Sequence, residues 1–189
     1  AKFTDFCEIS VPEDGCFRMN GFRSFLTKSL GVELIEQCST PLVVCATDLD
    51  NCCPVQWREG AIAERVMASC SIPIVFQPVK IDGLNYVDGG VLHNLPAWAI
   101  RDDCDYLIGI NCSPMVKKNT YKGTLLDVAQ RSYMLMAKTN AIADMHLCDL
   151  VIETKSIADM HVFNMHQKEL VFRSGYKAAR DAIKKAGLA

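Results

Sequence analysis

The sequence predicts an α/β protein with a largely parallel sheet and flanking helices. Two observations support this class. Short apolar runs rich in β-branched residues recur along the chain, which is typical of strands buried on both faces. These runs alternate with segments of ten or more residues that show helical spacing of apolar side chains. The chain has 189 residues and no segment that looks like a linker, so we expect a single domain over residues 1–189.

The first part of the chain is predicted to hold a helix, a buried strand and a second helix. Residues 21–31 have helical spacing, with Asn20 as the N-cap and Gly31 as the stop. Residues 42–47, LVVCAT, form a continuous apolar run typical of a buried strand, and a short strand follows around VQW. Residues 60–70 place their apolar side chains on one helical face.

A hairpin, a helix and a strand are predicted in the middle of the chain. Asp82 and Gly83 lie between two short extended segments, which is a strong signal for a tight hairpin. Asn94 is expected to begin a helix with Pro96 in its first turn, running through AWAIRDD. Residues 106–112, YLIGINC, are predicted to form another buried strand.

The last third of the chain is predicted to contain two helices and one strand. Thr124 begins TLLD, a sequence that resembles a capping box and opens a long helix to about residue 146. Residues 149–154, DLVIET, are predicted to form the last strand. Residues 166–187 form the last predicted helix, which ends in lysines and Gly187.

Composition and charge exclude several classes of function. Half of the residues are hydrophobic and 22% are charged, so the chain can bury a core. The net charge is −2 and no basic stripe stands out, so we expect no nucleic-acid partner. No apolar run approaches the roughly 18 residues of a membrane span, and the first residues, AKFTDFCEIS, do not resemble a signal peptide.

Cysteine and histidine patterns indicate neither disulfides nor metal. The ten cysteines form no C-x-x-C pair, and several lie in apolar runs, which favours free thiols in a reducing cytoplasm. The histidines at 146, 161 and 166 have spacings that match no zinc pattern. We therefore expect a cytoplasmic protein with no metal and no cofactor.

The stretch from residue 68 to residue 96 is the strongest candidate for a functional site. It reads ASCSIPIVFQP at 68–78, then Asp88, Gly89 and Gly90, then NLP at 94–96. An acid before two glycines is ordinary turn chemistry when taken alone. In α/β proteins, however, functional residues gather where strands end and helices begin, and Asp88 follows a short apolar strand.

This stretch resembles the patatin-like phospholipases, including bacterial members of the neuropathy-target-esterase type. In that family A-S-x-[AS]-x-P-x-x-F-x-P is followed by D-G-[GA] and usually by N-x-P. The resemblance implies a patatin-like fold and a lipid acyl hydrolase that uses a Ser–Asp dyad without histidine. Asp88 would be the dyad carboxylate, and Gly89 and Gly90 would let backbone pack closely around it. The implied substrates are phospholipids or lysophospholipids reached at a membrane surface.

The family's nucleophile motif is not in this sequence. The nucleophile of the family lies in a G-x-S-x-G turn, preceded by a glycine-rich oxyanion loop. None of the ten serines has glycine at both −2 and +2. We therefore expect the C-terminal portion of a patatin-like domain whose N-terminal part is missing. Such a chain would be inactive alone, would need the missing segment or a partner chain, and would expose apolar faces.

Blander interpretations stay open at several residues. Ser69 and Ser71 are more typical of small packing residues than of a nucleophile, and Asp48 and Asp50 are more typical of a polar strand end. His93 is close to Asp88 in sequence but is more typical of a polar loop residue than of a triad member. The alternative function is a non-catalytic α/β fragment that binds acyl chains or a protein partner.

Overall fold

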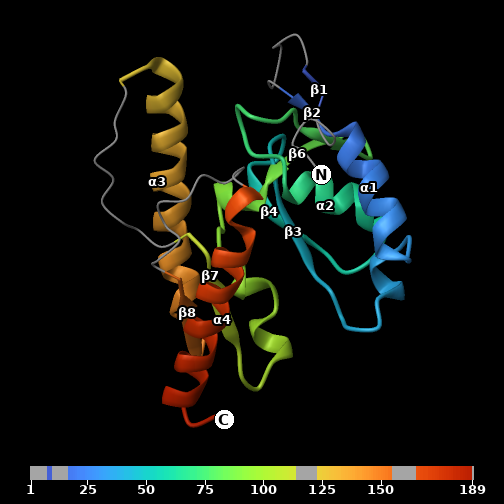
Figure 1. The fold of residues 1–189 in the computed structure, drawn as a ribbon. Helices are drawn as coiled ribbons and strands as arrows, with labels where there is room; N and C mark the ends of the chain where they lie inside the picture. Colours follow the sequence, from blue (N-terminus) through green and yellow to red (C-terminus); the bar gives the residue numbers. More distant parts are fainter. Residues whose placement is uncertain (1–7, 10–16, 114–122, 155–164, 189) are drawn as a thin grey trace. The chain divides into compact units, whose positions relative to one another are not determined.

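The chain folds as an α/β protein, as the sequence predicts (Figure 1). The computed structural model describes residues 8–9, 17–113, 123–154 and 165–188. The chain divides into two compact units, Ala1–His93 and Asn94–Ala189, and each unit is described by itself. The expectation of one domain stays a prediction. No helix in the described ranges is long and apolar enough to cross a membrane.

The first unit is built around a four-stranded sheet with the strand order β4-β3-β6-β5. Its strands are β3 (Val44–Asp48), β4 (Cys53–Trp57), β5 (Val79–Ile81) and β6 (Leu84–Asp88). Two very short strands, β1 (Glu8–Ile9) and β2 (Phe17–Arg18), pair with each other. The helices of this unit are α1 (Asn20–Leu30), η2 (Ile35–Gln37), α2 (Ile62–Ser69) and η3 (Gly89–Val91), of which η2 and η3 are 3₁₀ turns.

The prediction of a largely parallel sheet is wrong for this unit, because every pairing in its four-stranded sheet is antiparallel. The connections explain two of the three pairings, β3 with β4 and β5 with β6. Residues 49–52 join β3 to β4, and residues 82–83 join β5 to β6. A parallel pair needs a crossover of about a dozen residues or more, so these short connections permit only hairpins.

The structure confirms the local turn signals but not one capping signal. Asp82 and Gly83 have φ values of 50° and 91°, the pair of positive angles that a two-residue hairpin turn requires. Gly31 ends α1 in the left-handed conformation, as predicted. Asn20 is not the N-cap, because the helix begins at Asn20 and Met19 occupies the cap position without a side-chain bond. Met19 is buried in the core, so packing sets this end of the helix.

The core of this unit lies between α2 and the sheet. Ala68 of α2 and Ala46 of β3 are 0% and 1% exposed, and they belong to one cluster with Ile81 and Tyr86. An alanine on each element lets a helix approach a sheet closely, since neither carries a bulky side chain. This approach brings the end of α2 to the end of β6. The predicted burial of the LVVCAT strand is confirmed from Val44 onward, because all five residues of β3 are buried. Leu42 lies before the strand and is exposed.

The second unit contains the parallel pair β7 (Ile108–Asn111) and β8 (Leu150–Glu153) and two long helices, α3 (Leu125–Met145) and α4 (Lys168–Lys185). Three 3₁₀ turns, η4 (Ala97–Ala99), η5 (Arg101–Asp103) and η7 (Met165–Gln167), complete its described elements. The predicted cap of the long helix is confirmed, because the Thr124 hydroxyl accepts a hydrogen bond from the Asp127 N–H.

Two predictions for this unit are wrong. The segment AWAIRDD forms two 3₁₀ turns, because Ile100 between them leaves helical geometry at φ −133° and the buried Asp144 carboxylate accepts the Trp98 N–H. The strand in YLIGINC is not buried on both faces. Its burial alternates along β7, and Ile108 and Ile110 are 40% and 58% exposed.

Candidate active site

Asp88 lies at the end of β6, where backbone contacts hold it on two sides. It lies opposite Ala46 in the antiparallel register of β3 and β6. Its N–H donates to the Ser71 carbonyl oxygen at 3.0 Å, just beyond the end of α2. The Cα of Asp88 is therefore fixed by a central strand and by the turn after a packed helix, which is a rigid support for a functional side chain.

The carboxylate of Asp88 has one oxygen engaged and one oxygen available. Asp88 is the N-cap of η3, and its Oδ1 accepts a hydrogen bond of 2.7 Å from the Gly90 N–H. No residue that the structure describes donates to its Oδ2. Half-burial of the side chain raises the pKa of Asp88 above its ordinary value, and the Gly90 hydrogen bond opposes this only in part. Asp88 is thus a stronger base than an exposed aspartate.

Gly89 is required by a close backbone approach. A Cβ at this position would lie 3.0 Å from the carbonyl oxygen of Cys45 and 3.3 Å from its carbonyl carbon. The neighbour is the backbone of β3, which cannot rotate away as a side chain could. Gly90 is buried, and its N–H donates a hydrogen bond to the Asp88 carboxylate. The two glycines therefore fix the turn that carries Asp88 against the sheet.

Of the two serines in the ASCSIP block before Asp88, Ser71 is not available as a nucleophile. Ser71 is 0% exposed, and its hydroxyl donates to the Met67 carbonyl oxygen at 2.8 Å. Its carbonyl oxygen accepts from Asp88, so Ser71 positions the acid through its backbone. Ser69 is the last residue of α2 and is partly buried. The packing interpretation of Ser71 is confirmed.

Cys70 is a neighbour of Asp88 that the sequence analysis did not single out. Although Cys70 as a whole is exposed, burial of its thiol raises the pKa of Cys70, and the negative charge of Asp88 raises that pKa further. Both effects favour the thiol over the thiolate, and the thiolate is the nucleophilic form. The only sequence feature that points to Cys70 as a neighbour of Asp88 is its position between Ser69 and Ser71 in the ASCSIP block.

The acids at the end of β3 have structural roles, as the sequence analysis favoured. Asp48 is buried and accepts hydrogen bonds from the Asp50 N–H, the Asn51 N–H and the Asn51 side-chain amide, each at 2.9 Å. The Asn51 bonds are the main cause that lowers the pKa of Asp48. Asp50 accepts from the backbone and side chain of Asn85, which joins the turn after β3 to β6.

The described residues offer no site for a metal ion. They contain no group of three or more histidine, cysteine or acidic side chains that could hold one. His161 lies outside the described residues. His93 follows η3, and its N–H donates to the Gly89 carbonyl oxygen at 2.8 Å. None of the eight cysteines that the structure describes is in a disulfide.

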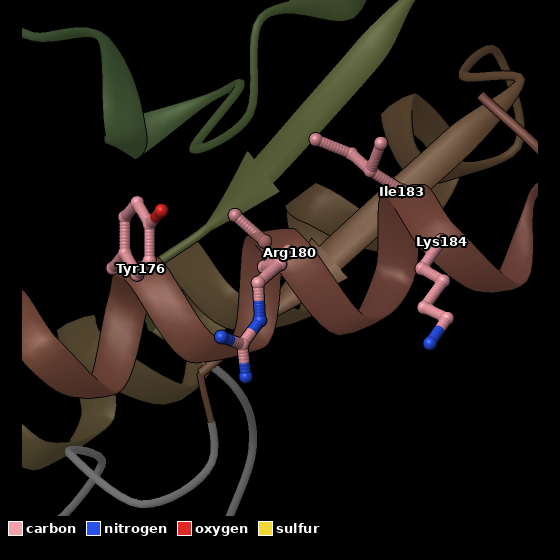
Figure 2. A pocket seen from close by; sticks show the side chains of 5 residues that line it. Tyr176, Arg180, Ile183 and Lys184 are labelled. Carbon is pink, nitrogen blue, oxygen red and sulfur yellow. The ribbon is translucent and has the colours of Figure 1, made fainter. Parts of the chain in front are cut away.

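A separate open hollow of about 420 Å³ lies along α4 and is not part of this site (Figure 2). Five residues of that helix line it, namely Tyr176, Ala179, Arg180, Ile183 and Lys184. None of the residues around Asp88 contributes to it.

Comparison with known proteins finds a family model that covers Asp88 and several similar curated proteins. The model of the patatin-like phospholipase family matches residues 5–100, just over half of the chain. Uncharacterised NTE family proteins from Mycobacterium bovis and from two strains of Mycobacterium tuberculosis are each 32% identical to it over 87 residues. That alignment covers 46% of this chain and 24% of each relative, so the chain spans about a quarter of the length of these curated relatives.

Proposed function

The chain belongs to the patatin-like phospholipase family, and from this premise we propose that Asp88 is the catalytic carboxylate of a lipid acyl hydrolase. One observation carries the proposal. Asp88 is held on a rigid strand end with Oδ1 bound by Gly90 and with no described donor on Oδ2. If Asp88 only shaped the turn, the hydrogen bond at Oδ1 would be enough. A second carboxylate oxygen that is half-buried and has no described donor indicates a functional role instead.

In the proposed reaction, Asp88 acts as a general base toward a serine hydroxyl. Oδ2 accepts the hydroxyl proton while the serine oxygen attacks the ester carbonyl carbon. The ester bond then breaks, the alcohol leaves with a proton, and an acyl-serine forms. Water attacks the acyl-serine in the same way and releases the fatty acid. The raised pKa of Asp88 suits this role, since a base works best when its pKa approaches the working pH.

The nucleophile of this proposal is not among the 189 residues. No serine in the sequence lies in a G-x-S-x-G turn. The Ser71 hydroxyl is buried and bonded, and the pKa of the Cys70 thiol is raised. We therefore propose that the chain alone is inactive and that a longer form of the protein or a partner chain supplies the serine. Phospholipids or lysophospholipids are the proposed substrates.

Hydrolysis of a p-nitrophenyl ester by a form of the protein that contains the G-x-S-x-G motif tests the proposal. Asp88→Asn keeps an oxygen that can accept from Gly90 but removes the base, so kcat should fall at least about a hundredfold. Asp82→Asn is the matched control, because Asp82 is an exposed turn acid at φ 50°, where asparagine is well tolerated. If the folded Asp88→Asn protein kept full activity, the proposal would be wrong and Asp88 would have only a structural role in the turn.

A further inference from the structure

We propose that helix α4 docks the protein on a surface of anionic phospholipid. Two parallel stripes of side chains run along this helix. Phe172, Tyr176, Ala179 and Ile183 form an apolar stripe, and Arg173, Lys177, Arg180 and Lys184 form a basic stripe. Both stripes follow the spacing i, i+4, i+7, i+11, which keeps their members on one side of an α-helix. The stripes are one residue apart, so they run next to each other.

This basic stripe corrects the sequence expectation that the chain has none. The chain has a net charge of −2, whereas α4 carries six basic and two acidic residues, a net charge of +4. The charge becomes a stripe only when helical geometry aligns it. In the basic stripe Arg173 pairs with Glu169 and Arg180 with Asp181, while Lys177 and Lys184 have no acidic partner among the residues that the structure describes.

The aromatic half of the apolar stripe is exposed, and Ala179 and Ile183 are half-buried. Phe172 and Tyr176 are 68% and 63% exposed, and their rings stack on each other with centroids 6.4 Å apart. Helix α4 also contacts β8. Figure 2 shows Tyr176 and Ile183 extending from one edge of the helix while Arg180 and Lys184 extend from the neighbouring edge. Adjacent exposed aromatic rings form an apolar patch, and such patches on a protein surface mark sites that contact other molecules.

Charge complementarity and the position of the rings together select the occupant. A helix that presents aromatic residues beside lysines and arginines suits the boundary between anionic headgroups and acyl chains. The rings enter the boundary, and the basic side chains meet the phosphates. The phosphates of a nucleic acid would also pair with the basic stripe. They would make no favourable contact with Ala179 and Ile183, the aliphatic end of the apolar stripe. The inference does not depend on the role of Asp88.

Co-sedimentation of the 189-residue chain with vesicles tests the proposal. Ether-linked phosphatidylcholine, alone or mixed with ether-linked phosphatidylserine, avoids any ester hydrolysis, so this test and the test of Asp88 fail separately. We expect binding to the mixed vesicles and little binding to phosphatidylcholine alone. Each basic residue near such a surface changes binding about fivefold, the equivalent of ~1 kcal/mol, so Lys177→Gln/Lys184→Gln should weaken binding about 25-fold.

Lys28→Gln/Lys80→Gln is the matched control, because it removes the same charge from exposed positions in the other unit. It should leave vesicle binding unchanged. Circular dichroism and thermal melting of both variants show whether they fold as the parent chain does. Equal weakening by the two double variants would overturn the proposal, because binding would then follow net charge rather than α4. Binding with no preference for phosphatidylserine would overturn it as well.

A tryptophan at position 172 provides a measurement that does not rely on lost binding. Phe172→Trp should gain quenching by brominated lipid in mixed vesicles relative to the parent chain. Leu125→Trp should gain none, because Leu125 is an exposed apolar residue of α3, at 87% exposure, outside the two stripes. Equal quenching at both positions would contradict docking through α4. Binding of a DNA duplex that requires Lys177 and Lys184, without vesicle binding, would assign the surface to nucleic acid instead.

Discussion

The packing of Gly89 against β3 predicts that Gly89→Ala lowers the free energy of unfolding, and by about how much. In Gly89→Ala the new Cβ would lie 3.0 Å from the Cys45 carbonyl oxygen, where ordinary contacts begin near 3.4 Å. The obstacle is strand backbone, so the η3 turn has to move. Overpacking of this kind costs about 1–3 kcal/mol. At about 2 kcal/mol, and with a urea m-value of about 2 kcal/mol/M, the midpoint should fall by about 1 M.

The same substitution at Gly175 should have the opposite sign. Gly175 lies inside α4 with helical φ and nothing within 4 Å of its Cβ position. Alanine there should stabilise the chain by about 0.5–1 kcal/mol, because glycine is the poorer helix former. This pair of variants separates a local contact from a general effect of adding a methyl group.

Each unit contains one tryptophan, which lets urea unfolding be followed in one unit at a time. Trp57 lies in Ala1–His93 and Trp98 in Asn94–Ala189. In a Trp98→Phe background, the fluorescence of Trp57 measures how Gly89→Ala changes the unfolding of the first unit. In a Trp57→Phe background, the fluorescence of Trp98 measures how Gly175→Ala changes the unfolding of the second unit. A Gly89→Ala chain as stable as its parent would refute the close approach to Cys45, and with it the account of why glycine follows Asp88.

Two further predictions concern stability. Asp88→Asn should raise the urea midpoint at pH 7, because burial raises the folded pKa of Asp88 and the ionised carboxylate therefore costs stability at neutral pH. The gain should shrink as the pH falls through that raised pKa and should vanish below 3.8, the ordinary value, where both states are protonated; a gain independent of pH would contradict the assignment. Thr47→Val should stabilise the first unit by about 1 kcal/mol, because the buried Thr47 hydroxyl has no hydrogen-bond partner in the described part of the chain. Destabilisation by Thr47→Val would mean that the hydroxyl is hydrogen-bonded.

The candidate site was predictable from the sequence in position and in residue type. The block at 68–78 and the turn at Asp88 stand out as written, and the family comparison covers both. The hairpin at Asp82 and Gly83 was also predictable, because two residues with positive φ encode that turn by themselves. The direction of the sheet was not predictable from the apolar runs, because a strand buried on both faces reads the same in parallel and antiparallel sheets.

The sequence by itself determined the local features of this protein: where its turns fall, where its helices end, and that an acid precedes two glycines at a strand end. The tertiary structure decided what surrounds that acid. The Cys45 carbonyl that excludes a Cβ at Gly89 and the Ser71 carbonyl that holds the Asp88 N–H come from separate segments. Likewise, the burial that raises the pKa of Asp88 depends on the fold around it. A turn is encoded by the residues within it, whereas burial and non-local hydrogen bonds exist only once distant segments have packed together.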